Sequence, residues 1–321
     1  MIEKLNQKLN NGVKENEILA GHVSFKIGGP ARYFYSAQNN DDLIASVKVA
    51  DELNIPYFIL GWGSNLLVSD AGFDGLVIKT NSNEYKITGE NIFVQAGFSL
   101  NRLVGIATQA GLSGLENFAG IPGTVGGAAR GNAGAFGIGF GDKIIELEIY
   151  RNGKIEKVDR DKMEYAYRSS ILKDRPGVIL SVVMKLQPGT KNDIQQKVID
   201  VIKARKNVPF EPSAGCIFKN CELSQLDIDQ DRIIKSLDIT LPEWQEVTRH
   251  GKLPVGYIID KLGLKEKTIG GAQISPKHCA FIINVGHARA EHVMMLISDI
   301  KMRVRNQLGI QLQEEVQYLG F

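Results

Sequence analysis

The sequence is poor in the residues that build disulfide frameworks and metal centres. Its 3 cysteines, Cys216, Cys221 and Cys279, cannot all pair with one another, so reduced thiols are expected. The C-x4-C spacing of the first two is a poor zinc spacing, and no histidine stands beside it. The 5 histidines form no cluster at ligand spacing, and no H-E-x-x-H motif occurs. We therefore expect neither a structural nor a catalytic metal.

A charge excess and a long apolar run are also missing. The 38 basic and 36 acidic residues leave a formal net charge of +2, and they are scattered, so there is no basic stripe that would recruit nucleic acid or an anionic membrane. No apolar stretch approaches the ~18 residues of a membrane span, and the first residues lack the apolar core of a signal peptide. We expect a cytoplasmic protein with no nucleic-acid partner and no membrane insertion.

What the sequence does contain is the mixture of strands and helices typical of the α+β fold class. The 321 residues exceed the ~250 to 300 at which a single core stops growing, so more than one domain is expected. Hydrophobic periodicity predicts a strand over 32–36, a helix over 41–53 and strands over 57–60 and 91–95. Further strands and helices follow, up to a helix over 192–206. Pro209 and Pro212 stop that helix. We therefore expect a domain boundary near Val208.

The predicted domains are 1–78, 79–207 and 208–321. The last one is expected to begin with a strand over 216–218 and to end with a helix over 291–308 and a strand over 311–319. Within it, residues 221–252 are polar and acidic, which favours a surface insertion over core. Our hypothesis is that this insertion forms a lid or covers a sheet edge.

Two segments hold more glycine than chain turns require, at 61–66 (G-W-G-S-N-L) and at 120–128 (G-I-P-G-T-V-G-G-A). Glycine lets the backbone adopt positive φ and approach a ligand closely, and successive N–H groups then converge on a phosphate. A single such loop is usually only a tight turn, but two together favour a dinucleotide site. Neither has the G-x-G-x-x-G pattern that opens a Rossmann helix, nor the Gly-Lys-Ser/Thr of a P-loop.

Four motifs connect these loops to a known family. They read S-F-K-I-G-G-P-A at 24–31, G-W-G-S-N-L-L at 61–67, G-L-E at 114–116 running into the second loop, and N-A-G-A at 132–135. Together they resemble the UDP-N-acetylenolpyruvoylglucosamine reductase (MurB) family across nearly the whole chain. The resemblance implies a two-part FAD-binding region of the vanillyl-alcohol-oxidase/PCMH type, and a C-terminal α+β domain that closes over the flavin to hold the substrate.

The resemblance also implies the cofactors and their contacts. FAD is expected to bind without a covalent link, because the loops hold no histidine or cysteine that could attach it, and NADPH is the expected reductant. The residues expected to bind the cofactor are Gly61, Gly63, Ser64, Asn65, Leu66, Gly120, Pro122, Gly123, Thr124, Gly126, Ala128, Asn132, Ala133, Gly134 and Ile179.

Three residues match the family's catalytic positions: Arg168, Cys216 and Glu315. Hydride addition to the enolpyruvyl methylene carbon pushes negative charge into the neighbouring carboxylate, and the Arg168 guanidinium would stabilise it. Cys216, where the family often has serine, would deliver the proton to the α-carbon, since a thiol with a reference pKa of about 8.5 is mostly protonated near neutrality. Glu315 would have to be protonated or orient a proton-bearing partner, so its pKa is expected to be raised.

Each of these residues has a structural alternative. An isolated arginine is usually a surface ion-pair partner, a small cysteine in an apolar strand is usually core packing, and Glu315 fits a solvated strand face. The resemblance, not the spacing, favours catalysis. It also makes Tyr167, Lys219 and Asn220 candidate substrate contacts, with Asn220 the better candidate of the last two.

The implied activity is NADPH-dependent reduction of UDP-N-acetylenolpyruvoylglucosamine to UDP-N-acetylmuramate in peptidoglycan precursor synthesis. The short connection over 173–179 resembles the type II subgroup, which lacks an extra substrate-capping loop, and a monomer is expected. Two other functions stay open at this point. One is an FAD-dependent oxidase or dehydrogenase acting on a hydroxy acid or sugar alcohol, and the other is a nucleotide-sugar or flavin-binding protein without catalysis.

Overall fold

A computed structural model describes residues 1–225 and 229–321, so three residues of the predicted insertion lie outside it. The chain divides into two compact units. Unit 1 comprises Met1–Glu17, Ala31–Trp62 and Asp74–Lys206, and unit 2 comprises Ile18–Pro30, Gly63–Phe73 and Asn207–Phe321. Two N-terminal segments thus belong to the unit that holds the C-terminus, a feature that the sequence did not indicate. The division at residues 78 and 207 stays a prediction.

The first sheet of unit 1 packs against two helices. Its strand order is β1-β2-β5-β3, and β3 pairs in parallel with β5, which lies between β2 and β3. The expected helix is capped by Asn39, whose side chain accepts a hydrogen bond of 2.8 Å from the Asp42 amide, as asparagine does at a helix start. The elements are α1 (Ile2–Lys8), β1 (Lys14–Ile18), β2 (Pro30–Ala37), α2 (Asn40–Glu52), β3 (Tyr57–Leu60) and β5 (Phe73–Thr80).

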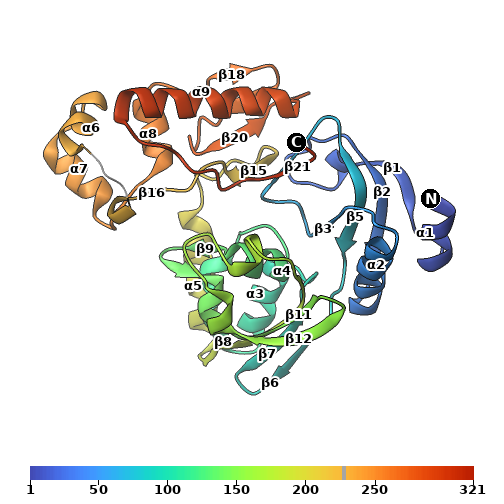
Figure 1. Cartoon of the computed structure of the whole chain (residues 1–321). Coiled ribbons are helices and arrows are strands. Elements are labelled where there is room, and N and C mark those ends of the chain that lie inside the picture. Colours follow the sequence, from blue (N-terminus) through green and yellow to red (C-terminus); the bar gives the residue numbers. More distant parts are fainter. Residues whose placement is uncertain (226–228) are drawn as a thin grey trace. The chain divides into compact units, whose positions relative to one another are not determined.

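The second sheet of unit 1 is antiparallel, with the order β12-β11-β13-β7-β6. Helix α4 packs against β7 and β13, and α3 and α5 pack against each other (Figure 1). Most of its buried residues form a core separate from that of the first sheet, while Tyr150, Val178 and Leu180 of β11 and β13 belong to the core of the first sheet. The elements are β6 (Tyr85–Thr88), β7 (Asn91–Gln95), α3 (Leu100–Gln109), β8 (Leu112–Ser113), α4 (Val125–Gly131), β9 (Gly134–Ala135), β10 (Ile138–Gly139), β11 (Ile144–Arg151), β12 (Lys154–Asp159), β13 (Val178–Lys185), β14 (Gln187–Pro188) and α5 (Lys191–Ala204).

Unit 2 is built around its last helix. The sheet order is β15-β20-β19-β18, and α9 packs against β18 and β19 (Figure 1). The residues spaced along the inner face of α9, Val293, Leu296 and Ile300 among them, are at most 2% exposed, as an amphipathic helix predicts. The elements are β4 (Leu66–Val68), β15 (Ser213–Cys216), β16 (Cys221–Glu222), α6 (Gln230–Ser236), α7 (Leu241–Thr248), β17 (Lys252–Leu253), α8 (Val255–Lys261), β18 (Thr268–Ile269), β19 (Ala272–Ile274), β20 (Phe281–Asn284), α9 (Ala290–Leu308) and β21 (Gln317–Leu319).

The expectation that 221–252 lies outside the core was wrong for several of its apolar residues. Ile233, Leu237 and Trp244 are at most 5% exposed and belong to the same core as α9. Ile233 and Leu237 are four positions apart and so share one helix face. The polar composition masked this short helical pattern. Residues 226–228 of the segment lie outside the described residues.

Among the helices of the described chain, none has the length and apolar character needed to cross a membrane.

Candidate active site

The two glycine loops meet inside unit 1. A Cβ added to Gly61 would lie 2.6 Å from Oγ1 of Thr124. Thr124 is 3% exposed, and its Oγ1 accepts a hydrogen bond of 3.2 Å from the Gly127 amide at the start of α4. The missing side chain at residue 61 is therefore what allows the two backbones to come this close.

The second loop leads directly into a helix, which the sequence did not indicate. The Gly126 amide donates a hydrogen bond of 2.8 Å to the Ala96 carbonyl, and a Cβ at residue 126 would lie 2.8 Å from the Ala96 Cβ. Gly120 and Gly123 have positive φ angles of +77° and +135°, which favour glycine. The loop is thus shaped by backbone contacts that only glycine permits, as expected of a cradle for a dinucleotide.

Asn101, which sequence analysis did not select, holds the start of this loop. Its Oδ1 accepts a hydrogen bond of 2.7 Å from the Gly120 amide, and its Nδ2 donates one of 3.1 Å to the Ile121 carbonyl. Because these partners are about twenty residues away in the chain, no local pattern points to the contact.

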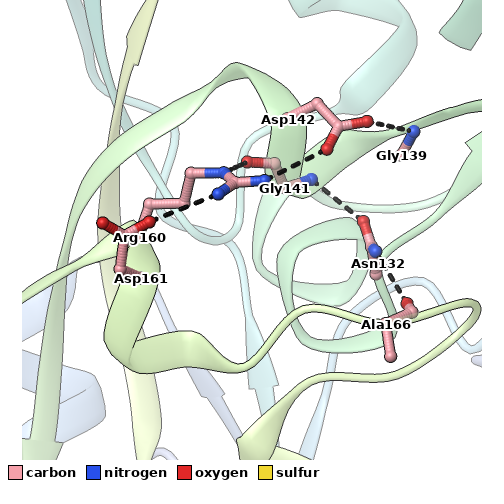
Figure 2. A network of polar contacts seen from close by, with 7 residues as sticks. All are labelled: Asn132, Gly139, Gly141, Asp142, Arg160, Asp161 and Ala166. Carbon is pink, nitrogen blue, oxygen red and sulfur yellow. Dashed lines mark hydrogen bonds and ion pairs between the residues drawn. The ribbon is translucent and has the colours of Figure 1, made fainter.

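Asn132 takes part in a polar network (Figure 2). It ends α4 in the left-handed conformation, with a φ of +45°, which asparagine tolerates better than most residues. Its Nδ2 donates a hydrogen bond of 2.8 Å to the Ala166 carbonyl, and its Oδ1 accepts one of 3.0 Å from the Gly141 amide. Both ends of the amide are therefore used inside unit 1. Its expected role in binding the cofactor stays a prediction.

Arg160 extends this network on the other side of Gly141. Its Nε donates a hydrogen bond of 2.9 Å to the Gly141 carbonyl, and its guanidinium lies 3.3 Å from carboxylate oxygens of both Asp142 and Asp161 (Figure 2). Asp142 in turn accepts a hydrogen bond of 2.9 Å from the Gly139 amide. The network fixes residues 139–142, where β10, the partner strand of Gly134, ends.

Arg168 stands in a two-residue turn of the same unit. Ala166 and Ser169 exchange two backbone hydrogen bonds of 3.1 Å, which leaves Tyr167 and Arg168 at the tip. The guanidinium carbon of Arg168 lies 5.5 Å from the centre of the Tyr167 ring, and a Cβ added to Gly134 would lie 2.9 Å from its Nη1. The structure thus brings the predicted catalytic arginine against a glycine of the predicted cofactor set.

In unit 2, Cys216 and Glu315 lie on neighbouring segments. The Glu315 amide donates a hydrogen bond of 2.8 Å to the carbonyl of Ile217, the residue after Cys216. Gly215, with a φ of +76°, interrupts the regular pairing of β15 just before Cys216. The segments that carry two of the three predicted catalytic residues therefore lie side by side, although they are far apart in sequence.

Asn65, from the predicted cofactor loop, joins this group. Its Nδ2 donates a hydrogen bond of 3.0 Å to the Glu315 carbonyl, and its own carbonyl accepts one of 3.0 Å from the Gln317 amide. Gly63 has a φ of +60°, and a Cβ there would lie 2.6 Å from Val23 Cγ1. The loop is thus as closely packed in unit 2 as Gly61 is in unit 1.

The environment of the other two cysteines separates them from Cys216. Burial raises the pKa of both Cys221 and Cys279 to about 11, so these thiols stay protonated and inert near neutral pH. Cys216 is partly exposed. It is therefore the cysteine whose environment best suits proton exchange with a ligand.

The remaining candidate residues lie in different surroundings. Lys219 lies close to Gln313, with its amide 2.9 Å from the Gln313 carbonyl. The Oδ1 of Asn220 accepts a hydrogen bond of 3.1 Å from Val255 and so caps α8. Ile179 is 7% exposed in β13. Their expected ligand contacts stay predictions. In the described residues, no group of three or more His, Cys, Asp or Glu side chains is placed to hold a metal ion.

Known proteins resemble the chain over its full length. Residues 9–159 match the model of an FAD binding domain, and residues 206–319 match that of the UDP-N-acetylenolpyruvoylglucosamine reductase C-terminal domain. The reductase of that name from Anoxybacillus flavithermus is 36% identical over 99% of both chains, and the one from Bacillus subtilis is 35% identical over 100% of this chain and 98% of its own. The crystal structure of the Thermus caldophilus reductase (MurB) is 31% identical, with a TM-score of 0.74 over 95% of this chain and 98% of that one.

Proposed function

The chain belongs to the UDP-N-acetylenolpyruvoylglucosamine reductase family, and we propose that Arg168, Cys216 and Glu315 carry its reaction. The predicted α+β fold class with an FAD-binding region is confirmed. The chain is an FAD-dependent oxidoreductase that reduces UDP-N-acetylenolpyruvoylglucosamine to UDP-N-acetylmuramate with NADPH, in peptidoglycan precursor synthesis. The observation that carries the residue assignment is the hydrogen bond between Glu315 and Ile217, because it holds the segments of the predicted proton donor and the predicted acid side by side.

The glycine loops fit FAD by their shape. Gly61 and Gly126 stand where a Cβ would collide with Thr124 and Ala96, and the positive φ angles of Gly120 and Gly123 turn the second loop so that its bare backbone can approach a ligand closely. We assign to FAD the residues predicted for it, with Gly61 and the second loop as the principal contacts. FAD reduced by NADPH supplies the hydride.

Side chains of the protein stabilise the charge that develops on the substrate and supply the proton. When the methylene carbon of the substrate accepts hydride, the electron pair of the double bond moves to the α-carbon and into the adjacent carboxylate. The Arg168 guanidinium stabilises this charge. Cys216 then donates its thiol proton to the α-carbon, which completes the lactyl ether, and the thiolate regains a proton from solvent. Glu315, in its protonated form, adds a hydrogen bond to the same charge, and its raised pKa stays a prediction.

Substitution of Cys216 tests this assignment. We expect C216A to keep normal FAD reduction by NADPH but to slow product formation about 10²- to 10⁴-fold, the usual contribution of a positioned acid. C216S should retain activity, because the hydroxyl can also donate a proton. The two half-reactions are followed separately by stopped-flow absorbance of the flavin, with C279A as the cysteine control. Unchanged turnover in C216A would remove Cys216 from the mechanism.

Several finer assignments go with this function. We propose that Tyr167, Lys219 and Asn220 contact the UDP-sugar, that the enzyme is of type II, and that it acts as a cytoplasmic monomer. Sedimentation of the FAD-bound protein tests the oligomeric state. An oxidase would be reoxidised by oxygen faster than by the UDP-sugar, so the ratio of these two rates separates the reductase from that alternative.

A further inference from the structure

The backbone of Arg168 is held in a conformation that arginine rarely adopts. Its φ is +55°, in the left-handed region where side chains other than glycine, asparagine and aspartate are uncommon. Such a residue keeps this conformation only when the surrounding contacts enforce it. The contacts around the turn 166–169 should therefore decide where the guanidinium points.

Lys173 makes the most direct of these contacts. Its Nζ donates a hydrogen bond of 2.7 Å to the carbonyl oxygen of Arg168. The donor is charged and the contact is partly buried, and both features strengthen a hydrogen bond. The bond holds the peptide plane that follows Arg168, and so restrains its ψ angle.

The base of Lys173 is itself fixed to the rest of unit 1. The Lys173 amide donates a hydrogen bond of 3.0 Å to the Ser170 carbonyl. Ser170 is 2% exposed, and its hydroxyl donates a hydrogen bond of 2.7 Å to the Arg130 carbonyl at the end of α4. Through these bonds Lys173 ties the backbone of Arg168 to α4, the helix that follows the second glycine loop.

A second restraint acts on the other side of the turn. The Nδ2 of Asn132 holds the Ala166 carbonyl at 2.8 Å (Figure 2). Both ends of the turn are thus restrained, while the Arg168 guanidinium lies against the bare backbone of Gly134. Release of the Arg168 carbonyl would let the turn relax toward a commoner conformation, and the guanidinium would move with it.

We propose that Lys173 is a positioning residue that holds Arg168 in its left-handed conformation and thereby sets the guanidinium for the charge that develops on the substrate. The inference rests on the role proposed for Arg168. Lys173 acts on the backbone of Arg168 and takes no part in binding FAD or in hydride transfer.

K173M tests the proposal, because methionine keeps most of the length of the side chain and removes the donor. We expect the oxidation of reduced FAD by the UDP-sugar to slow about 10- to 100-fold, the size of effect that a small misplacement of a catalytic group produces. FAD reduction by NADPH should stay within twofold of wild type. K173R, which keeps the charge and the donors, should recover most of the rate. K162M removes a lysine that is 71% exposed and should change neither half-reaction.

A double-mutant cycle separates this inference from the proposed function. If Lys173 acts through Arg168, adding K173M to R168M should slow the oxidative half-reaction by less than twofold beyond R168M alone. Fully additive losses would overturn the inference, as would a normal oxidative rate in K173M when R168M is slow. A normal oxidative rate in R168M would instead refute the role proposed for Arg168.

Discussion

The side-chain amide of Asn65 donates a hydrogen bond of 3.0 Å to the backbone carbonyl of Glu315. The carbonyl of Asn65 accepts a second one from the Gln317 amide, and the strands that follow, β4 and β21, pair in parallel from Leu66 and Gln317 onward. The first glycine loop and the segment that carries the predicted acid are therefore one structural element. A substitution of Asn65 should therefore shift the position of Glu315.

We expect N65A to slow the oxidative half-reaction and to lower the free energy of unfolding by about 1 kcal/mol, the usual value of one lost hydrogen bond. The matched control is N81A, since the Nδ2 of Asn81 donates a hydrogen bond of 2.6 Å to Ser36 in an exposed part of unit 1. Urea unfolding and stopped-flow flavin absorbance measure the two effects. An N65A variant as active as N81A would show that the Glu315 carbonyl needs no such support.

The sequence predicted the regular strands of the fold well and its irregular ones poorly. The strands over 57–60 and 91–95 occur at the predicted bounds, because buried residues and turn signals define both ends. The strand predicted over 216–218 is instead Ser213–Cys216, since Gly215 bends the chain. The one predicted over 311–319 is only Gln317–Leu319, because the residues before it make isolated contacts, such as the bridge between Phe218 and Glu314.

Within the site, the residue types were predictable but their supports were not. Family motifs pointed to Cys216 and Glu315, yet the bond that makes their segments neighbours joins backbone atoms and leaves no pattern in the sequence. Helix α4 was missed because its glycines have low helix propensity, although Thr124 is a good helix cap. The support that Lys173 gives to Arg168 depends on a left-handed backbone, which sequence alone does not reveal.

Gly126 and Gly105 both lie in helices, and they should respond in opposite ways to the same substitution. In G126A the new methyl group would meet the Ala96 Cβ at 2.8 Å, and such overpacking costs about 1 to 3 kcal/mol. In G105A the methyl group meets nothing within 4 Å, so the better helix propensity of alanine should stabilise the protein by up to about 1 kcal/mol. Thermal unfolding of the apoprotein measures both, and equal shifts of the same sign would contradict the close packing of α4.

Glu116 should make the stability of unit 1 depend on pH. Burial alone would raise the pKa of its carboxyl group, but hydrogen bonds from the Ser113 hydroxyl at 2.6 Å and the Gly114 amide at 2.7 Å outweigh this and lower it. A lowered pKa means that the folded state favours the carboxylate. Its stabilisation is therefore present above the unfolded value of about 4.3 and is lost as the pH falls through the folded value.

We accordingly expect E116Q to lower the free energy of unfolding by about 1 to 3 kcal/mol at pH 7, the cost of disturbing a buried charged hydrogen-bond acceptor. The difference from wild type should shrink as the pH falls below about 4. S113A removes one donor and should give a smaller loss with the same pH trend. Urea unfolding between pH 7 and pH 3.5 measures these differences, and a constant gap across that range would disprove the linkage.

Trp62 should report directly on the cofactor. It stands between Gly61 and Gly63 and is 44% exposed, whereas the other tryptophan of the chain, Trp244, is 5% exposed in the core of unit 2. In W244F, acrylamide should quench the emission of Trp62 readily in the apoprotein and much less after FAD is added, because the bound dinucleotide would shield the exposed ring. W62F serves as the control, since buried Trp244 should be poorly quenched with or without FAD. Energy transfer to the flavin also shortens the excited-state lifetime of both residues, so each quenching slope is divided by the lifetime measured without acrylamide, and the resulting quenching rate constant isolates shielding. An unchanged rate constant for W244F at saturating FAD would mean that the first glycine loop does not cover the cofactor.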